Sequence, residues 1–172
     1  FNMKKLLGIL VLGLLLSGNA YTSEWAVTIE NNEFENKKSI YLASDDALPN
    51  KKLSFPYEDT SSNLMIGCNG KGYYWIYFFF NKVNLKSDGF TSDGNSTAKA
   101  SVKYGEKVSG LELYFGTGSN FIMIDSDYKE VMFERISEYS SIMVQFDHFS
   151  DGKRYYKYNT LNFTEAYNQN CK

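Results

Sequence analysis

The chain's single histidine, His148, is the side chain best suited to acid–base chemistry, because an imidazole titrates close to neutral pH. Asp147 and Asp151 flank it in the sequence. A catalytic triad also needs a nucleophile held on a dedicated turn, and the sequence contains no G-x-S-x-G motif. We therefore expect His148, at a strand end before a turn, to be a solvated or packing residue, and we assign no catalytic residue.

Paired acidic residues raise a second kind of chemistry, since two converging carboxylates serve as acid and base in glycoside hydrolysis. The pairs are Asp45 with Asp46, Glu58 with Asp59, and Asp125 with Asp127. Neighbours on a strand point to opposite faces, and Asp125 and Asp127 straddle the start of an expected helix. We therefore expect solvated turn residues at these positions.

The loop at residues 88–95 carries oxygen ligands of the kind that calcium prefers, namely Asp88, Asp93 and Asn95. Its spacing does not fit a twelve-residue calcium loop, because the last position holds Lys99 in place of a bidentate acid. A zinc site is not indicated either, since the chain has one histidine and no C-x-x-C motif. The sequence therefore predicts no metal site and no cofactor.

Aromatic residues make up 17% of the chain, and exposed rings bind sugars, lipids and proteins through large contact areas. The first dense run, YYWIYFFF at 73–80, is large and apolar at every position, which favours a strand covered on both faces over an exposed binding platform. The pattern leaves open which of its two alternate sets faces the main core. In the second run, KRYYKYNTL, aromatic and basic residues mix, which favours partial exposure. A core strand and an exposed platform are both open there, and on the second interpretation Tyr155, Tyr156 and Tyr158 form a candidate binding surface.

Residues 1–20 have the features of a secretory signal peptide: a basic start, an apolar stretch over residues 6–16, and a small-x-small sequence at 18–20. An uncleaved membrane anchor is the alternative, but the apolar stretch is shorter than the roughly 20 residues that a spanning helix needs. We expect cleavage, a mature chain that begins near Tyr21, and no integral membrane segment afterwards. The expected location is periplasmic or secreted.

The composition of the remaining chain, residues 21–172, points to a single β-rich domain. Its length is about one domain's worth, and its abundant tyrosine and phenylalanine favour strands over helices. Removal of the first 20 residues takes away two of the 18 basic side chains and none of the 20 acidic ones. Because nucleic-acid binding calls for a basic face, we expect no nucleic-acid partner.

The two cysteines, Cys68 and Cys171, are expected to form one disulfide, because an exported chain folds in an oxidising compartment. Closing a loop of about 100 residues stabilises a fold by about 4 to 5 kcal/mol on the chain-entropy model. Two free thiols and half of a metal site are the alternatives. Asn69-Gly70-Lys71-Gly72 predicts a hairpin turn between strands at 63–68 and 73–80, so the disulfide would join this hairpin to the C-terminal helix.

Period-two alternation and turn residues predict a series of short strands. They cover residues 24–30, 39–46, 63–68, 73–80, 97–105, 109–116, 120–125, 141–149 and 153–161. A helix near 127–139, with Ser126 or Asp127 as N-cap, and a short helix that carries Cys171 follow from the later pattern. We expect an exposed loop at 81–96, and an edge or one-sided strand at 97–105, where lysines alternate with small residues.

The fold class that these elements predict is mainly β: an antiparallel β-sandwich or open barrel with two helices, closed by one disulfide. Parallel pairing is disfavoured, because most of the expected strands have no helix between them.

The order of motifs resembles that of VasI-type periplasmic proteins, which are associated with type VI secretion clusters. A Trp-containing first strand, an L-x-I-x-C strand and a final strand with a short helix ending in a second cysteine follow one another in this order. The matching positions are Leu64, Ile66 and Cys68 in the first motif and Phe163, Ala166 and Cys171 in the second. The chain departs from the family in its aromatic strand at 73–80 and its acidic loop at 88–95. The resemblance implies a small disulfide-closed β-sandwich without cofactor or catalytic residues.

These observations favour an exported, non-enzymatic binding or accessory protein that contacts another protein of the cell envelope, and the resemblance adds an association with secretion. One alternative is a small hydrolase or inhibitor-type protein acting on cell-wall glycan or peptide, which would place His148 and two converging carboxylates in a pocket. Another is a carrier of a small ligand or lipid, which would need a hollow interior lined by the aromatic strands.

Overall fold

The computed structural model describes residues 25–32 and 37–172, so the predicted signal peptide at 1–20 lies outside the described residues. The strands are β1 (Ala26–Asn32), β2 (Lys37–Ala43), β3 (Ser62–Cys68), β4 (Tyr74–Phe80), β5 (Gly89–Phe90), β6 (Ser96–Tyr104), β7 (Lys107–Phe115), β8 (Phe121–Ile124), β9 (Ser141–His148) and β10 (Gly152–Asn159). The helices are α2 (Ser126–Glu138) and α3 (Phe163–Cys171). Neither of these two helices is long and apolar enough to cross a bilayer.

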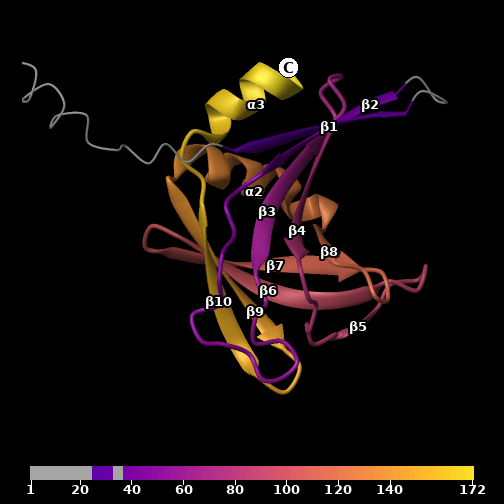
Figure 1. Cartoon of the computed structure of the whole chain (residues 1–172), viewed down its shortest axis with the longest axis vertical. Coiled ribbons are helices and arrows are strands. Elements are labelled where there is room, and N and C mark those ends of the chain that lie inside the picture. Colours follow the sequence, from indigo (N-terminus) through magenta and orange to yellow (C-terminus); the bar gives the residue numbers. More distant parts are fainter. Residues whose placement is uncertain (1–24, 33–36) are drawn as a thin grey trace, which may run out of the picture.

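The strands form one antiparallel sheet in the order β1-β2-β3-β4-β8-β7-β6-β9-β10, with β5 paired to β6. The sheet curls, so that its β10 edge approaches the segment between β2 and β3 (Figure 1). Isolated bridges join Ala47 to Ser62 and Pro49 to Tyr156, and the Tyr158 hydroxyl donates a 2.8 Å hydrogen bond to Oγ of Ser62. The predicted mainly antiparallel β fold is confirmed, and it takes the form of an open, barrel-like sheet.

Large aromatic side chains fill the inside of the curl. Burial alternates along β9, because successive side chains of a strand point to opposite faces. Phe78 and Phe80 of β4 pack against Phe146 of β9 with ring centroids 5.1 and 5.2 Å apart and nearly perpendicular planes. Tyr156 of β10 packs against Phe80 in the same edge-to-face manner. Each such ring buries a large apolar area, and burying one side chain of this kind stabilises the fold by about 1.5 to 3 kcal/mol.

Strand β4 has different surroundings on its two faces. Ile76, Phe78 and Phe80 point into the core and are at most 1% exposed. Trp75 and Phe79 belong to the opposite set and are only partly buried. The strand is therefore large and apolar on both faces, as predicted, but its second face is only partly covered.

Helix α2 lies toward one end of the curled sheet, in the upper part of Figure 1. It buries Met132 and Ile136 in the common core. Its N-cap is Asp125, whose carboxylate accepts a 3.0 Å hydrogen bond from the backbone nitrogen of Asp127. The predicted helix is confirmed, while the predicted cap at Ser126 or Asp127 is wrong by one or two residues, because Asp125 already reaches the free backbone N–H groups of the first turn.

Helix α3 is joined to the sheet by a disulfide between Cys68, the last residue of β3, and Cys171, the last residue of α3. The two Cα atoms are 5.7 Å apart, and both residues are 1% exposed. The predicted pairing is confirmed, and so is the predicted hairpin, since β3 and β4 pair in antiparallel register from Ser62 with Phe80 to Cys68 with Tyr74.

The region after β4 differs from expectation in two respects. The predicted loop contains β5, which pairs with the start of β6. Strand β6 is not an edge strand, because it pairs with β7 on one side and β9 on the other. Its one-sided character is confirmed: Ala98, Ala100 and Val102 are buried while Lys99 and Lys103 are exposed. Alternation with lysine indicates that one face of the strand is exposed to solvent, and it carries no information about the number of neighbouring strands.

Candidate functional site

A groove crosses the outer face of the sheet, over β1, β2, β3, β4 and β8. Its volume is about 430 Å³, and its lining is mainly apolar. The lining residues are Thr28, Glu30, Tyr41, Met65, Trp75, Tyr77, Phe121 and Met123. Clefts that bind small molecules have volumes of about 300 to 1,000 Å³, and the volume of the groove falls within this range.

The strand register explains why these residues meet. Met65 of β3 lies opposite Tyr77 of β4, and Tyr77 lies opposite Met123 of β8. The three side chains therefore form a row across neighbouring strands on one face of the sheet. Phe121 extends this row, since its ring centroid is 5.4 Å from that of Tyr77.

Gly67 leaves open the space that the largest ring of the groove, the Trp75 indole, occupies. Gly67 of β3 lies opposite Trp75 of β4, and a Cβ atom built on Gly67 would come within 2.2 Å of the indole. The indole therefore occupies the space above Gly67 and lies over β3. Tyr41 of β2, which lies opposite Gly67 on the other side, brings its ring to 6.1 Å from the indole at an angle of 73°.

The polar part of the groove comes mainly from β1. Glu30 is the one charged side chain among the described residues that line the groove. Burial raises the pKa of the Tyr77 hydroxyl, and electrostatic interactions with Tyr41 and then Glu30 raise it further. The groove thus combines aromatic walls with one negative charge at its rim.

Strand β1, beside the groove, is an edge of the sheet and pairs with β2 alone within the described ranges. Its side chains over residues 26–31 are exposed, among them Val27 at 44% and Ile29 at 50%. The opposite edge is partly covered, because Asn50 and Tyr155 of β10 exchange two hydrogen bonds of 3.0 Å. An exposed edge strand is a template for pairing with a strand of another chain.

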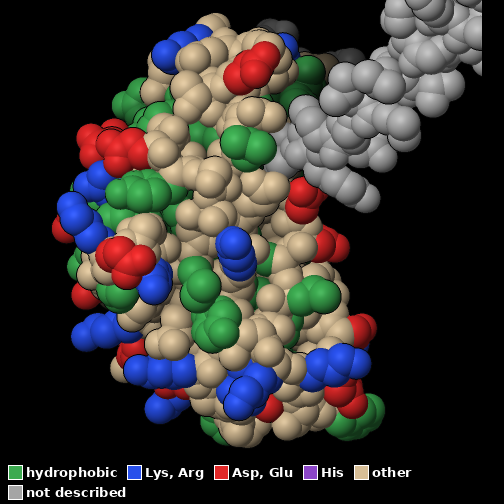
Figure 2. Space-filling model, turned by 90° about the vertical axis from the view of Figure 1, so that its left-hand side faces the viewer, with side chains coloured by type: hydrophobic (Ala, Val, Ile, Leu, Met, Phe, Trp, Pro, Cys, Tyr) green, Lys and Arg blue, Asp and Glu red, His purple; other side chains and the backbone are tan. Residues whose placement is uncertain are grey.

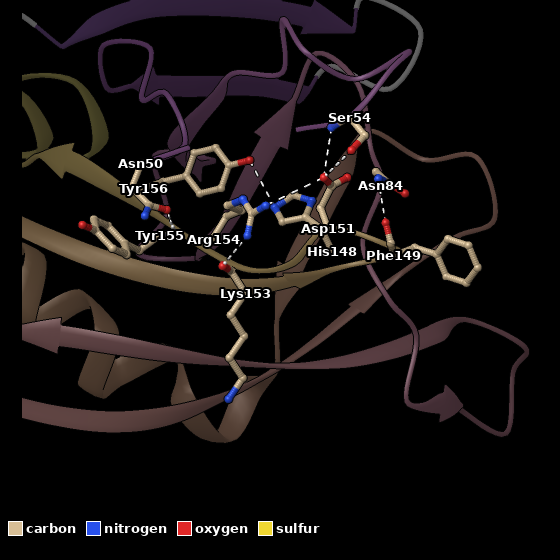
Figure 3. Close-up of polar contacts among 10 residues, drawn as sticks. All are labelled: Asn50, Ser54, Asn84, His148, Phe149, Asp151, Lys153, Arg154, Tyr155 and Tyr156. Carbon is tan, nitrogen blue, oxygen red and sulfur yellow. Dashed lines mark hydrogen bonds and ion pairs between the residues drawn. The ribbon is translucent and has the colours of Figure 1, made fainter. Parts of the chain in front are cut away.

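His148 lies inside the protein, 1% exposed at the end of β9. Its Nε2 atom is 3.2 Å from the hydroxyl of Tyr156 (Figure 3). The pKa of His148 is lowered to about 4, chiefly by burial and to a smaller extent by Arg154, against the opposing effects of the Asn84 backbone and the acidic neighbours Asp151 and Asp147. The imidazole is therefore neutral at neutral pH.

The carboxylate of Asp151 holds two segments of the fold together. Its Oδ1 atom accepts hydrogen bonds of 3.0 Å from the backbone nitrogen and 2.9 Å from the hydroxyl of Ser54, and Nη2 of Arg154 is 3.8 Å away. Figure 3 shows Ser54, Arg154 and Asp151 pointing toward one another. The Ser54 hydroxyl thus bonds to Asp151 and not to His148, so the two do not form a nucleophile–base pair. Of the two predicted roles for His148, packing is the one observed.

The candidate binding surface at Tyr155, Tyr156 and Tyr158 does not form as predicted. Tyr156 and Tyr158 are 0% exposed and belong to the core, whereas Tyr155 is 40% exposed and points to the opposite side of β10 (Figure 3). The side of the molecule that carries β10 shows Lys and Arg gathered in its lower part and hydrophobic side chains in separate small patches (Figure 2). The exposed face of β10 carries Lys153, Tyr155 and Lys157, which occupy alternate positions of the strand. The mixture of aromatic and basic residues in the sequence therefore reflects strand alternation.

The acidic loop uses its side chains to fix its own shape. The Asp93 carboxylate accepts hydrogen bonds from the hydroxyl of Thr91 at 2.5 Å and the side-chain amide of Asn95 at 3.0 Å. Asp88 accepts one of 2.9 Å from the backbone nitrogen of Lys99. Across residues 25–32 and 37–172, no group of three or more His, Cys, Asp or Glu side chains comes together as metal ligands would.

The paired carboxylates make separate local contacts. Asp46 accepts a 2.8 Å hydrogen bond from the side chain of Asn63, and Asp59 forms a 2.7 Å ion pair with Lys82. Asp125 caps α2. One carboxylate of each pair therefore has a structural partner of its own.

The groove was not predicted from the sequence as a site, although the strand at 73–80 was singled out. A sequence signal exists in the unbroken runs of large apolar residues in β4 and β8 and in Gly67, which lies opposite Trp75 in the hairpin. The register between strands that are distant in the sequence, such as β4 and β8, decides which of these residues meet, and no local pattern encodes it.

Comparisons of the chain with protein-family models, with curated proteins and with solved structures give no match. The resemblance to VasI-type proteins therefore stays a prediction.

Proposed function

We propose that the protein is an exported, non-enzymatic binding protein of the cell envelope that holds an extended segment of another envelope protein. One observation carries the proposal: an aromatic groove lies directly beside β1, an edge strand paired on one side within the described residues. Main-chain pairing with an edge strand provides affinity, and a neighbouring groove provides side-chain specificity. Both kinds of contact are available here in one place.

The disulfide supports the proposed location. A buried Cys68–Cys171 bond forms and persists in an oxidising compartment, which agrees with the signal peptide predicted at residues 1–20. The predicted resemblance to VasI-type proteins agrees with an accessory role in the envelope and motivates a search for the partner among secretion components.

The two alternative functions have less support. A hydrolase would need an accessible histidine near free carboxylates, but His148 is 1% exposed and Asp151 is engaged by Ser54. An internal carrier would need a hollow core, but Phe78, Phe80 and Phe146 fill the inside of the sheet. Hydrolysis of envelope polymers by the purified protein, abolished in His148→Ala, would refute the proposal.

Photo-cross-linking from envelope extract tests the binding mode. A photoreactive amino acid at Thr28, on the groove rim, should cross-link an envelope protein, and Trp75→Ala in the same bait should abolish the product because it removes the largest wall of the groove. The matched control carries the photoreactive residue at Lys103, which is exposed on β6. A product that forms equally from Lys103, or that survives Trp75→Ala, would show that the partner binds elsewhere.

A further inference from the structure

We infer that the groove is specific for a cationic side chain, a lysine or arginine of the partner segment, which binds against Trp75 and Tyr41 with Glu30 as its counter-charge. The inference rests on the proposed function, because the partner protein supplies this side chain.

The aromatic walls provide the first reason. The rings of Trp75 and Tyr41 are 6.1 Å apart at 73°, so the two ring planes meet in a corner on the outer face of the sheet. Tryptophan and then tyrosine are the rings that attract cations most strongly, within about 6 Å of the ring centroid. The indole is held in this position because it fills the space above Gly67.

The charge of the groove provides the second reason. Glu30 is its one charged side chain, and neither lysine nor arginine contributes to its lining in the described residues. A carboxylate at the rim attracts an entering cation and repels an anion. A purely apolar side chain would gain from the aromatic walls but would make no use of the Glu30 charge.

The other cation–aromatic contacts of the protein provide the third reason. Nζ of Lys129 lies 4.6 Å from the ring centroid of Tyr74, and the Arg135 guanidinium lies 4.9 Å from that of Tyr104. These two rings are already occupied by cations of the same chain. Within the part of the chain that the structure describes, the corner formed by Trp75 and Tyr41 has no such cation.

The edge strand gives the cation a route into the groove. A strand added to β1 would lie about 4.8 Å from it, with alternate side chains on the face that carries Thr28 and Glu30. Tyr41 lies opposite Thr28 in the register of β1 with β2, so it is the groove residue that a side chain passing over Thr28 meets next. From such a strand a long lysine or arginine side chain can pass Glu30 and approach Tyr41, but the Trp75 indole lies over β3, three strand spacings away. The cationic residue that binds between the two rings therefore belongs to the part of the segment that continues from the β1 edge onto the outer face.

Nuclear magnetic resonance of the mature, disulfide-bonded protein offers a readout with an internal control. Two tryptophans give two indole N–H signals: Trp75 reports the groove, and Trp25 reports a buried position where its Nε1 donates a 3.1 Å hydrogen bond to the carbonyl of Leu161. The probes are short extended peptides with alternating threonine and valine around one central residue, which is lysine, arginine, norleucine or glutamate.

The expected result is a shift of the Trp75 signal with the lysine and arginine peptides, an unmoved Trp25 signal, and no binding of the glutamate peptide. The dissociation constant should rise about fivefold or more in Glu30→Gln and in Tyr41→Leu, which keeps apolar bulk but removes the ring. Glu106→Gln, in the exposed turn after β6, is the matched control and should leave it unchanged.

Three outcomes would overturn the inference: equal or tighter binding of the norleucine peptide, unchanged affinity in Glu30→Gln, or no response of Trp75 to any peptide. The proposed function is judged separately, by the loss of the Thr28 cross-link in Trp75→Ala. If that cross-link behaves as expected while norleucine binds as well as lysine, the partner is bound in the groove through an apolar side chain and only the inferred charge specificity fails.

Discussion

The stability of the protein should fall as the pH drops from 7 toward 4, and the buried His148 should be the main reason. Its pKa is lowered in the folded protein from about 6.5 to about 4, primarily because burial disfavours the charged imidazole. Above pH 6.5 the imidazole is neutral in both the folded and the unfolded state, so its burial does not lower the free energy of unfolding through a charge. Below 6.5 the unfolded chain takes up a proton that the folded protein resists, and stability declines until the pH reaches the folded pKa.

The size of the effect follows from the two pKa values. A single proton taken up by the unfolded chain between these values lowers the free energy of unfolding by about 2 kcal/mol at pH 5 and about 3 kcal/mol at pH 4. The sequence has one histidine, so no second imidazole contributes. The lowered pKa values of Asp59 and Asp93 act at still lower pH, because their stabilisation is lost only as the pH falls below the ordinary value of 3.8.

Urea unfolding at pH 7 and pH 5, followed by circular dichroism, measures the difference. With a urea dependence of about 2 kcal/mol per molar, the midpoint of the wild-type protein should move down by about 1 M. His148→Gln removes the titrating group and should show a much smaller change between the two pH values, whatever its stability at pH 7. Equal losses in the two proteins would refute the assignment of the pH dependence to His148.

Three further variants test the fold and the groove. Replacing both Cys68 and Cys171 by alanine should lower the free energy of unfolding by about 2 to 5 kcal/mol, and a loss below that range in urea titrations would show that the unfolded chain is not much restricted by the cross-link. Phe78→Ala should cost about 3 to 5 kcal/mol, because its ring is 0% exposed and packs on Phe146, and a calorimetric scan with an unchanged midpoint would contradict this. Gly67→Ala should cost about 1 to 3 kcal/mol or displace the Trp75 indole outward, seen as red-shifted emission; normal stability with unchanged emission would mean that the indole does not lie over Gly67.

Local patterns in the sequence were enough to predict most elements of the fold. Alternation defined β6 and β9, turn residues separated β3 from β4, and period-three-to-four spacing identified α2. The pairing of Cys68 with Cys171 followed from the number of cysteines and the expected compartment. These features depend on neighbouring residues or on simple counting, so they do not require knowledge of the strand order.

The candidate site could not be predicted in the same way. Trp75 and Tyr77 belong to a run that was singled out, but their neighbours Tyr41 and Phe121 come from strands whose positions in the sheet follow from long-range pairing. The aromatic residues of β10 illustrate the opposite error. Tyr156 and Tyr158 share a strand with exposed lysines, yet they point into the core because the lysines occupy the other set of alternate positions.

The position of the disulfide also determines what happens to a protein that a protease has cut. Cys68 and Cys171 are 103 positions apart, so the covalent loop that they close includes every strand from β4 to β10 and both described helices. A single cut anywhere in this loop, for example in the exposed part of the segment between β4 and β6, leaves the two fragments covalently joined. Their ends cannot diffuse apart, so the strands can pair again as parts of one molecule. A protein built in this way can be nicked and still remain a single particle until the disulfide is reduced.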